Sequence, residues 1–192
     1  MKAIGAATVA GGMGHTPKGA RAKFEVENAR FRFGSSPITV EAIVVPEDNG
    51  FQDLVGQWNG WYLNSWRLCL NTSGNVMLTL SQDGLDTVHQ PFFNVPIMPG
   101  NKYYIAAVVV EPGVSNEGKD GRLTLHYRDL TNDGPLKSMK HPLSGFSKLR
   151  AAPLASALTL GGTIPQNQPR AIDEVRISWG ALGVHELLDS GM

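Results

Sequence analysis

The stretch WRLCLNTSGNVMLTL, residues 66–80, decides the fold class of this sequence. At both of its ends, apolar side chains recur at every second position, which is the period of a half-buried β-strand. Between these ends, Asn71 to Gly74 are residues that favour a tight turn. The stretch therefore predicts a β-hairpin, with Trp66, Leu68 and Leu70 on one face of the first strand and Val76, Leu78 and Leu80 on one face of the second. A slip of one residue would turn all six side chains outward, so the register is well specified.

Further strand patterns lie on both sides of this hairpin. Alternating or continuous apolar runs predict strands near residues 24–27, 30–33, 38–45, 53–58, 103–110, 122–127, 157–160 and 171–178, with a bend at Asn28 and Ala29 between the first two. A helical spacing occurs only after Gly180, where Leu182, Val184, Leu187 and Leu188 are available to one stripe of a short C-terminal helix. Many strands with one short helix predict an all-β fold, a two-sheet antiparallel sandwich, and argue against an α/β fold.

The last predicted strand contains an irregularity. In AIDEVRIS, residues 171–178, Ile172 is out of phase with Val175 and Ile177. An extra residue in one strand shifts this alternation, so the pattern predicts a β-bulge or a twist at Asp173 and Glu174.

The composition restricts the partners of the chain. With 192 residues it is expected to form one domain. The 17 Lys and Arg residues balance 17 Asp and Glu residues, which argues against a general nucleic-acid binder. A single cysteine, Cys69, excludes an intrachain disulfide and a cysteine-based zinc cluster. No run approaches the ~20 apolar residues that cross a bilayer, so we expect no membrane insertion.

Residues 1–23 are rich in glycine and contain few bulky side chains. Met1-Lys2 and the apolar run after it are similar to a weak signal peptide, but that run is rich in Ala and Gly rather than in Leu. Such a segment cannot bury enough apolar surface to fold alone. We interpret it as an arm that docks on its own domain or on a neighbouring subunit, and we expect one folded domain over residues 24–192.

Four stretches resemble the concanavalin A-like lectin and glucanase superfamily, specifically its laminin-G-like jelly-roll branch. They are SSPITVEAIVVPEDNG (35–50), WRLCLNTSGNVMLTLSQDG (66–84), KYYIAAVVVE (102–111) and AIDEVRISWGALGVHELL (171–188). The last is the most specific, because such a strand followed by a short Ala-Leu helix is typical of the end of these domains. The resemblance implies a jelly-roll sandwich. Lectins, glycanases, adhesion modules and structural proteins share this fold, so individual residues must decide the function.

The sequence contains few candidate catalytic residues. Retaining glycosidases need two carboxyl groups about 5–5.5 Å apart on one face, and only Glu25 and Glu27 have a matching strand spacing. We interpret that pair as a solvated strand face. Cys69 is expected to face away from the leucines beside it, next to Arg67, as a small packing residue. We therefore expect a protein without catalytic residues.

Aromatic residues around position 60 form the candidate ligand site. Aromatic rings stack on the apolar faces of sugar rings, and loops present them to solvent. Trp66 belongs to the core face of the hairpin, whereas the candidates for an exposed glycan platform are Trp58, Asn59, Trp61, Tyr62 and Asn64. The alternative, that these rings cover one end of the sandwich or pack against another subunit, stays open.

The resemblance also implies a calcium site, because many domains of this kind bind calcium through loop oxygens. Calcium takes six to eight oxygen ligands, and the candidates here are Asp48, Asn49, Asp83, Asp133 and Asp173. Asp173 is the first choice because it lies in the closing strand. The others also lie beside glycine in turn sequences, where they need no metal. No cofactor is required by either interpretation.

Two functions are predicted from these features. The first is a lectin-like surface recognition module that binds glycan or a partner protein surface. The alternative is a structural or decoration protein of a virus particle or surface lattice, which self-assembles or docks through its N-terminal arm and lies on a virion or an extracellular surface. A glycoside hydrolase is the least favoured function.

Overall fold

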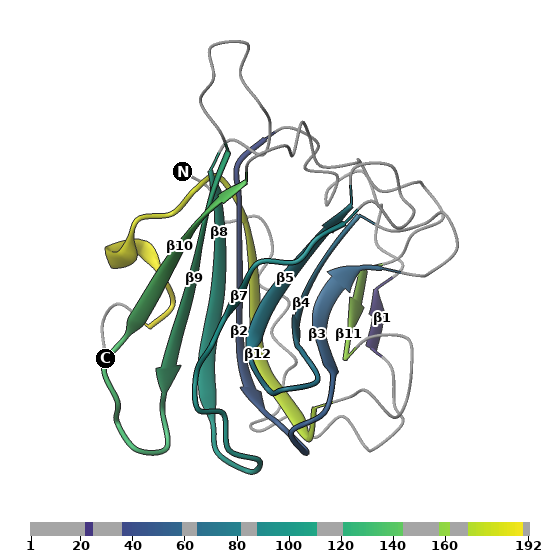
Figure 1. Cartoon of the computed structure of the whole chain (residues 1–192), viewed down its shortest axis with the longest axis vertical. Helices are drawn as coiled ribbons and strands as arrows, with labels where there is room; N and C mark the ends of the chain where they lie inside the picture. The colour runs from purple at the N-terminus through teal and green to yellow at the C-terminus, as the bar shows by residue number, and fades with distance from the viewer. Residues whose placement is uncertain are drawn as a thin grey trace.

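Two antiparallel β-sheets pack face to face in the computed structural model of the chain (Figure 1). The structure describes residues 22–24, 36–58, 65–81, 88–110, 121–143, 158–161 and 169–189. This architecture confirms the predicted all-β jelly-roll sandwich. In the described part of the chain, no helix is long and apolar enough to span a membrane.

The first sheet has seven strands and contains the predicted hairpin. Its order is β1-β11-β3-β4-β5-β6, and β7 pairs with β5. The strands are β1 (Ala22–Phe24), β11 (Leu158–Leu160), β3 (Gln52–Gln57), β4 (Trp66–Leu70), β5 (Val76–Ser81), β6 (Val88–His89) and β7 (Phe92–Phe93). Trp66 lies opposite Leu80 and Leu68 lies opposite Leu78, which confirms the predicted register.

The second sheet has five strands in the order β10-β9-β8-β2-β12. The strands are β10 (Lys137–Leu143), β9 (Gly121–Asp129), β8 (Tyr103–Val110), β2 (Ile38–Val45) and β12 (Ala171–Trp179). The pairing of β12 with β2 shifts register between Ile172 and Glu174, so the predicted bulge at Asp173 is confirmed.

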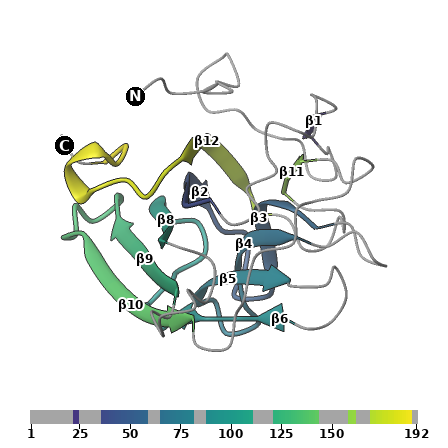
Figure 2. The same cartoon turned by 90° about the horizontal axis from the view of Figure 1, so that it is seen from above.

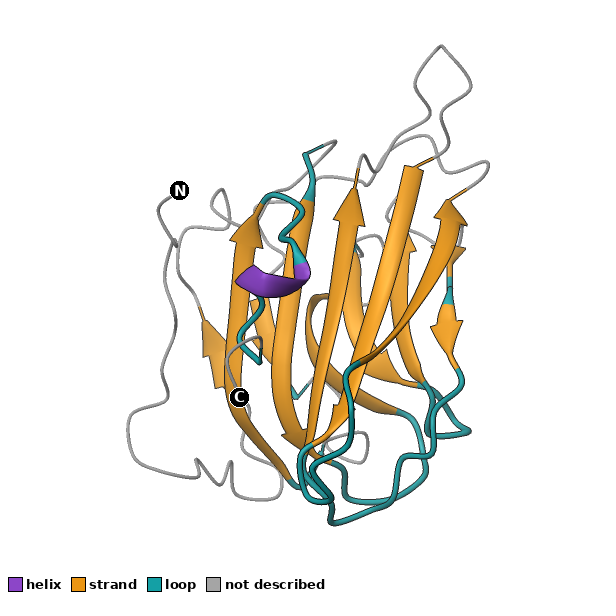
Figure 3. Cartoon of the chain, turned by 90° about the vertical axis from the view of Figure 1, so that its left-hand side faces the viewer, coloured by secondary structure: helices purple, strands orange, loops and turns teal. Residues whose placement is uncertain are grey.

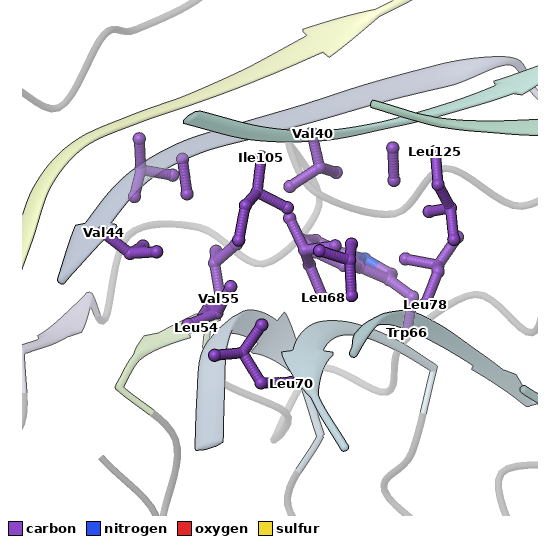
Figure 4. Packing of buried hydrophobic residues seen from close by; sticks show 14 of the residues in the cluster. Val40, Val44, Leu54, Val55, Trp66, Leu68, Leu70, Leu78, Ile105 and Leu125 are labelled. Carbon is purple, nitrogen blue, oxygen red and sulfur yellow. The ribbon is translucent and has the colours of Figure 1, made fainter. Parts of the chain in front are cut away.

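The core lies between the two sheets (Figure 4). Trp66, Leu68 and Leu78 point from β4 and β5 toward Val40 and Ile105 of the other sheet, and all five are fully buried. Each buried aliphatic side chain contributes roughly 1.5–3 kcal/mol of hydrophobic stabilisation. The assignment of Trp66 to the core rather than to the ligand site is therefore confirmed.

The structure departs from the sequence prediction at several elements. The two-residue strands β6 and β7 were not predicted. Strand β10 was not predicted, because its sequence KSMKHPL is mostly polar and mostly exposed, and it pairs only with β9 at the edge of the sheet. The predicted short C-terminal helix is present as the 3-10 helix η3 (Val184–Glu186). Its expected apolar stripe is wrong at Val184, which is 53% exposed, whereas Leu187 is buried.

The segment that contains η3 covers the outer face of the five-stranded sheet (Figure 3). Leu187 is buried in a small second core with Ile43, Tyr104 and Val108, whose side chains point away from the main core. Seen from above, this segment lies beside β8 and β9, on the side away from β3, β4 and β5 (Figure 2). At the other end of the chain, Ala22 and Lys23 of the predicted arm already pair with β11, and residues 1–21 lie outside the described residues.

Candidate functional site

The outer face of the seven-stranded sheet carries a charged residue at its centre. Arg67 and Cys69 alternate with the core residues of β4, so their side chains point away from the core. Arg67 lies opposite Gly56 on one side and Thr79 on the other, whereas Cys69 lies opposite Asp53 and Met77. These pairs give the outer face two cross-strand rows, one of which contains a cation and the other a carboxylate.

Gly56 lets β3 and β4 approach closely beside Arg67. A methyl group at this position would lie 2.6 Å from both the Arg67 Cβ and the Trp66 carbonyl oxygen, which is much closer than such atoms approach each other. The side chain of Arg67 then reaches residues that belong to β3 or flank it. Close backbone approach is a frequent reason for glycine inside a strand.

Two aromatic rings hold the Arg67 guanidinium. Its Cζ atom lies 4.7 Å from the centroid of the Phe51 ring and 4.5 Å from that of Trp58. Phe51 precedes β3 and Trp58 follows it, so the two rings approach from opposite ends of one strand. Each such cation–π contact is worth about 0.5–2 kcal/mol, depending on its exposure. We call Phe51, Asp53, Trp58 and Arg67 the Arg67 cluster.

The protein itself satisfies this guanidinium poorly. Nη1 of Arg67 donates to Oδ1 of Asp53 over 3.4 Å, which is long for an N–H···O hydrogen bond. Nε of Arg67 is buried without a hydrogen-bond partner in the part of the chain that the structure describes. Burial raises the pKa of Asp53, and this effect outweighs the opposing influence of Arg67. The cation is therefore fixed in place but only loosely paired.

Cys69 lies next to this cluster, and its thiol is expected to be unreactive. Its side chain is fully buried, and its Sγ lies 3.6 Å from the Met77 carbonyl oxygen and 3.8 Å from the Thr79 hydroxyl. Burial raises the pKa of the thiol to about 12, against the opposing effect of Arg67. At neutral pH the residue is a thiol rather than a nucleophilic thiolate. Its predicted position, facing away from the leucines and packed beside Arg67, is confirmed.

Solved structures with the same arrangement of sheets include carbohydrate-binding proteins. The CBM40 domain of the Ruminococcus gnavus IT-sialidase, bound to α2,3-sialyllactose, superposes with a TM-score of 0.61 and 17% identity over 88% of this chain and 90% of that one. The chain therefore shares the two-sheet sandwich fold of this domain. No family model matches the chain, and no curated protein does.

Two larger proteins contain a similar domain. The leech intramolecular trans-sialidase, complexed with 2,7-anhydro-Neu5Ac, gives a TM-score of 0.58 and 16% identity, and tailspike protein 2 of Escherichia coli O157:H7 bacteriophage CAB120 gives 0.50 and 16%. The matched region is 90% of this chain and 26% of the trans-sialidase, and 93% of this chain and 23% of the tailspike protein. At such low identity the likeness establishes the fold alone, and the laminin-G-like assignment stays a prediction.

Of the predicted glycan platform, the structure describes Trp58 alone. Trp58 lies half-buried against Arg67, whereas Asn59, Trp61, Tyr62 and Asn64 lie outside the described residues, so the platform stays a prediction. Glu25 and Glu27 lie outside them as well. Arg67 lies on the face of β4 that strand alternation predicts, whereas its contacts with Phe51 and Asp53 were not predicted.

The predicted calcium ligands are not brought together where the structure describes them. Asp48 accepts hydrogen bonds from the backbone N–H of Gly50 and the side chain of Gln52 in its own turn. Asp133 pairs with Arg128, and Asp173 pairs with Lys102. Asn49 is exposed, and Asp83 lies outside the described residues. Among the residues that are described, no group of three or more His, Cys, Asp or Glu side chains could hold a metal ion.

The other outer face of the sandwich is closed by a buried polar network. The carboxylate of Glu41, fully buried in β2, accepts hydrogen bonds from the Tyr104 hydroxyl and the Leu188 backbone N–H, both at 2.7 Å, and from Nε of Arg176. Arg128 binds both oxygens of Asp189 at 3.0 and 3.1 Å. These contacts fix the C-terminal segment across the five-stranded sheet. The outward side chains around Arg67 are also mostly buried, with Cys69 and Thr79 at 0% exposure, so the candidate site is limited to the exposed part of the Arg67 cluster.

Proposed function

We propose that this protein is a non-catalytic, lectin-like recognition module that binds glycan at the Arg67 cluster. The observation that carries the proposal is an arginine–carboxylate pair held between two aromatic rings on the outer face of a sheet. Aromatic rings stack on sugar rings, and charged groups form the strongest hydrogen bonds to polar ligand groups. Both kinds of group occur together in this cluster.

One further observation supports this surface over the other one, and a second supports a glycan as the ligand. The C-terminal segment covers the outer face of the five-stranded sheet, where Glu41 and Arg176 already satisfy each other. The fold is shared over most of the chain with a bacterial module whose solved structure contains sialyllactose. Sialylated oligosaccharides are therefore the first glycans to test, together with neutral ones.

A binding role without catalysis agrees with the carboxylates of the sheet. Asp53 is the only carboxylic residue in the seven described strands of this sheet. Most glycoside hydrolases use two carboxyl groups that flank the scissile bond, one as an acid and one as a nucleophile or base. We therefore propose recognition of a glycan rather than its cleavage.

A glycan array with the full chain tests the proposal. We expect binding to a defined set of glycans and loss of that binding in Trp58→Ala. Trp179→Ala is the matched control, because Trp179 lies at the end of β12 in the other sheet and is 37% exposed. Folding of each variant is checked by circular dichroism. An array without any bound glycan, or equal loss in both variants, would contradict the proposal.

A structural role on a larger particle is the second candidate, since a bacteriophage tailspike contains a domain of similar fold. Both roles are compatible, because a surface module of a particle can also bind glycan. Sedimentation of the full chain and of a chain without residues 2–22 separates them. A large assembly that falls apart without this arm would support the structural role, whereas a monomer in both cases would argue against it.

A further inference from the structure

We propose that Arg67 selects acidic sugars, by pairing its guanidinium with the carboxylate of the bound glycan. This inference rests on the proposed glycan site and names the class of ligand for it. The Arg67 cluster provides the cation, its fixed orientation and access from solvent.

Arg67 has more hydrogen-bond donors than the protein uses. A guanidinium carries five N–H donors that lie in its plane. In the described part of the chain, its hydrogen bonding consists of the 3.4 Å contact to Asp53, and its buried Nε has no partner. The Phe51 and Trp58 rings contact the cation but accept none of the in-plane donors. A carboxylate offers two oxygens in the geometry that fits such a planar fork.

Asp53 is an incomplete counter-ion for this cation. The distance between Nη1 and Oδ1 exceeds that of a charge-assisted N–H···O bond, which is about 2.7–2.9 Å. No other carboxylic residue occurs in the seven described strands of the sheet. Burial raises the pKa of Asp53 more than Arg67 lowers it, so the pairing with Arg67 does not offset the desolvation of this carboxylate. The carboxylate of a bound glycan therefore meets the Arg67 guanidinium, whose position is fixed and whose charge is only partly neutralised by Asp53.

The Arg67 side chain is partly exposed and preorganised. The exposed fraction of this side chain is 18% and its Nε atom is buried, so a ligand carboxylate has to approach the part of the guanidinium beyond Nε. The close approach of β3 at Gly56 and the two ring contacts restrict its rotamers before a ligand binds. Less conformational entropy is then lost on binding, which favours affinity.

Titration calorimetry with matched sugars tests this inference. The probes are 3′-sialyllactose and a disaccharide that ends in glucuronic acid, each beside its neutral carboxamide. We expect at least one acid to bind about tenfold or more tightly than its carboxamide, since a charge-assisted bond is lost. Carboxamides or neutral glycans that bind as well as the acids would overturn the inference and leave the proposed function intact. A protein that binds none of these sugars and no glycan of the array would overturn both.

Two variants with opposite expected effects complete the test. Arg67→Lys keeps the charge but removes the fork, and we expect about tenfold weaker binding of the acidic sugar. Asp53→Asn removes the internal counter-ion, and we expect binding of that sugar to strengthen, an effect that misfolding cannot produce. Arg170→Lys, at an exposed position outside the sheet, is the matched control and should bind like the wild type. Unchanged affinity in Arg67→Lys, or weaker binding in Asp53→Asn, would contradict the inference.

Discussion

At Gly56 the backbone of β3 lies so close to β4 that a methyl group has no room. Gly56→Ala must therefore push the two strands apart beside Arg67. We expect a loss of about 1–3 kcal/mol in the free energy of unfolding, as for other overpacked sites. Urea unfolding monitored by tryptophan fluorescence measures it.

Gly134 provides the control for this variant. A methyl group there would meet Asp129 at 3.5 Å, an ordinary contact distance, so Gly134→Ala should change stability by only ~0.5 kcal/mol. Equal stability of the two variants would show that the strands do not approach each other as closely as described.

The thiol of Cys69 should be unreactive in the folded protein. Burial raises its pKa to about 12, and the side chain has no exposed surface. We expect no measurable reaction with a disulfide reagent at pH 8 in buffer, and reaction of one thiol per chain in denaturant. Rapid labelling of Cys69 in the native protein would show that the side of β4 that carries Cys69 and Arg67 is not buried.

His126 should make the folded state sensitive to mild acid. Burial lowers its pKa below the ordinary value of 6.5, although Glu41 acts weakly in the opposite direction, and its Nδ1 lies 2.7 Å from the Ser138 hydroxyl. Between the folded pKa and 6.5 the unfolded chain binds more protons than the folded one. Stability therefore falls as the pH drops through this window.

We expect His126→Gln to flatten this decline between pH 7 and pH 5, measured as urea midpoints. His185→Gln, at an exposed position, should keep the slope of the wild type. A His126 variant with the same slope as the wild type would contradict the assignment of the pH dependence to this residue.

Among the elements, the C-terminal segment depends on one buried carboxylate. Glu41 is fully buried and holds Tyr104, Arg176 and the backbone of Leu188. Glu41→Ala leaves Arg176 without its carboxylate, and breaking such a buried pair costs about 3–5 kcal/mol. We expect a comparable loss in urea unfolding, with faster amide hydrogen exchange in residues 182–189.

Glu174→Ala is the matched control for this prediction. Glu174 lies on the same outer face of the sheet, but it is exposed, so we expect a change of ~0.5 kcal/mol or less. If Glu41→Ala leaves the exchange of the C-terminal residues unchanged, the carboxylate does not anchor them.

The success of sequence prediction also differs between elements. The β4–β5 hairpin and the bulge in β12 were predicted correctly, because buried faces impose a strict period of two. Strand β10 was missed, since an exposed edge strand shows no such period. The C-terminal leucines were assigned to a helix because their spacing fits one, but Leu187 is buried by packing against the sheet instead.

The candidate site was harder to predict than the fold. Alternation along β4 places Arg67 outside the core, but its neighbours come from another strand. The pairing of β3 with β4 shifts register between Asp53 and Val55, and no feature of the sequence specifies this shift. The partners Phe51 and Asp53 were therefore not predicted, and Trp58 was chosen only for its aromatic ring.

For the whole molecule, the two outer faces of the sandwich differ in how well their charged side chains are paired within the chain. The face of the five-stranded sheet is covered by the C-terminal segment, and its buried charges are satisfied within the chain. The face of the seven-stranded sheet carries Arg67, whose charge is held between rings and loosely paired. This difference is the reason for placing glycan recognition on the second face.

The most direct test is an amide chemical-shift titration of the isotope-labelled full chain with the strongest glycan from the array. We predict that the largest shifts occur at the Arg67 cluster, including the indole N–H of Trp58, while Glu41, Arg176 and Leu188 on the other face stay unchanged. Shifts confined to the five-stranded face, or to residues remote from Arg67, would contradict the account.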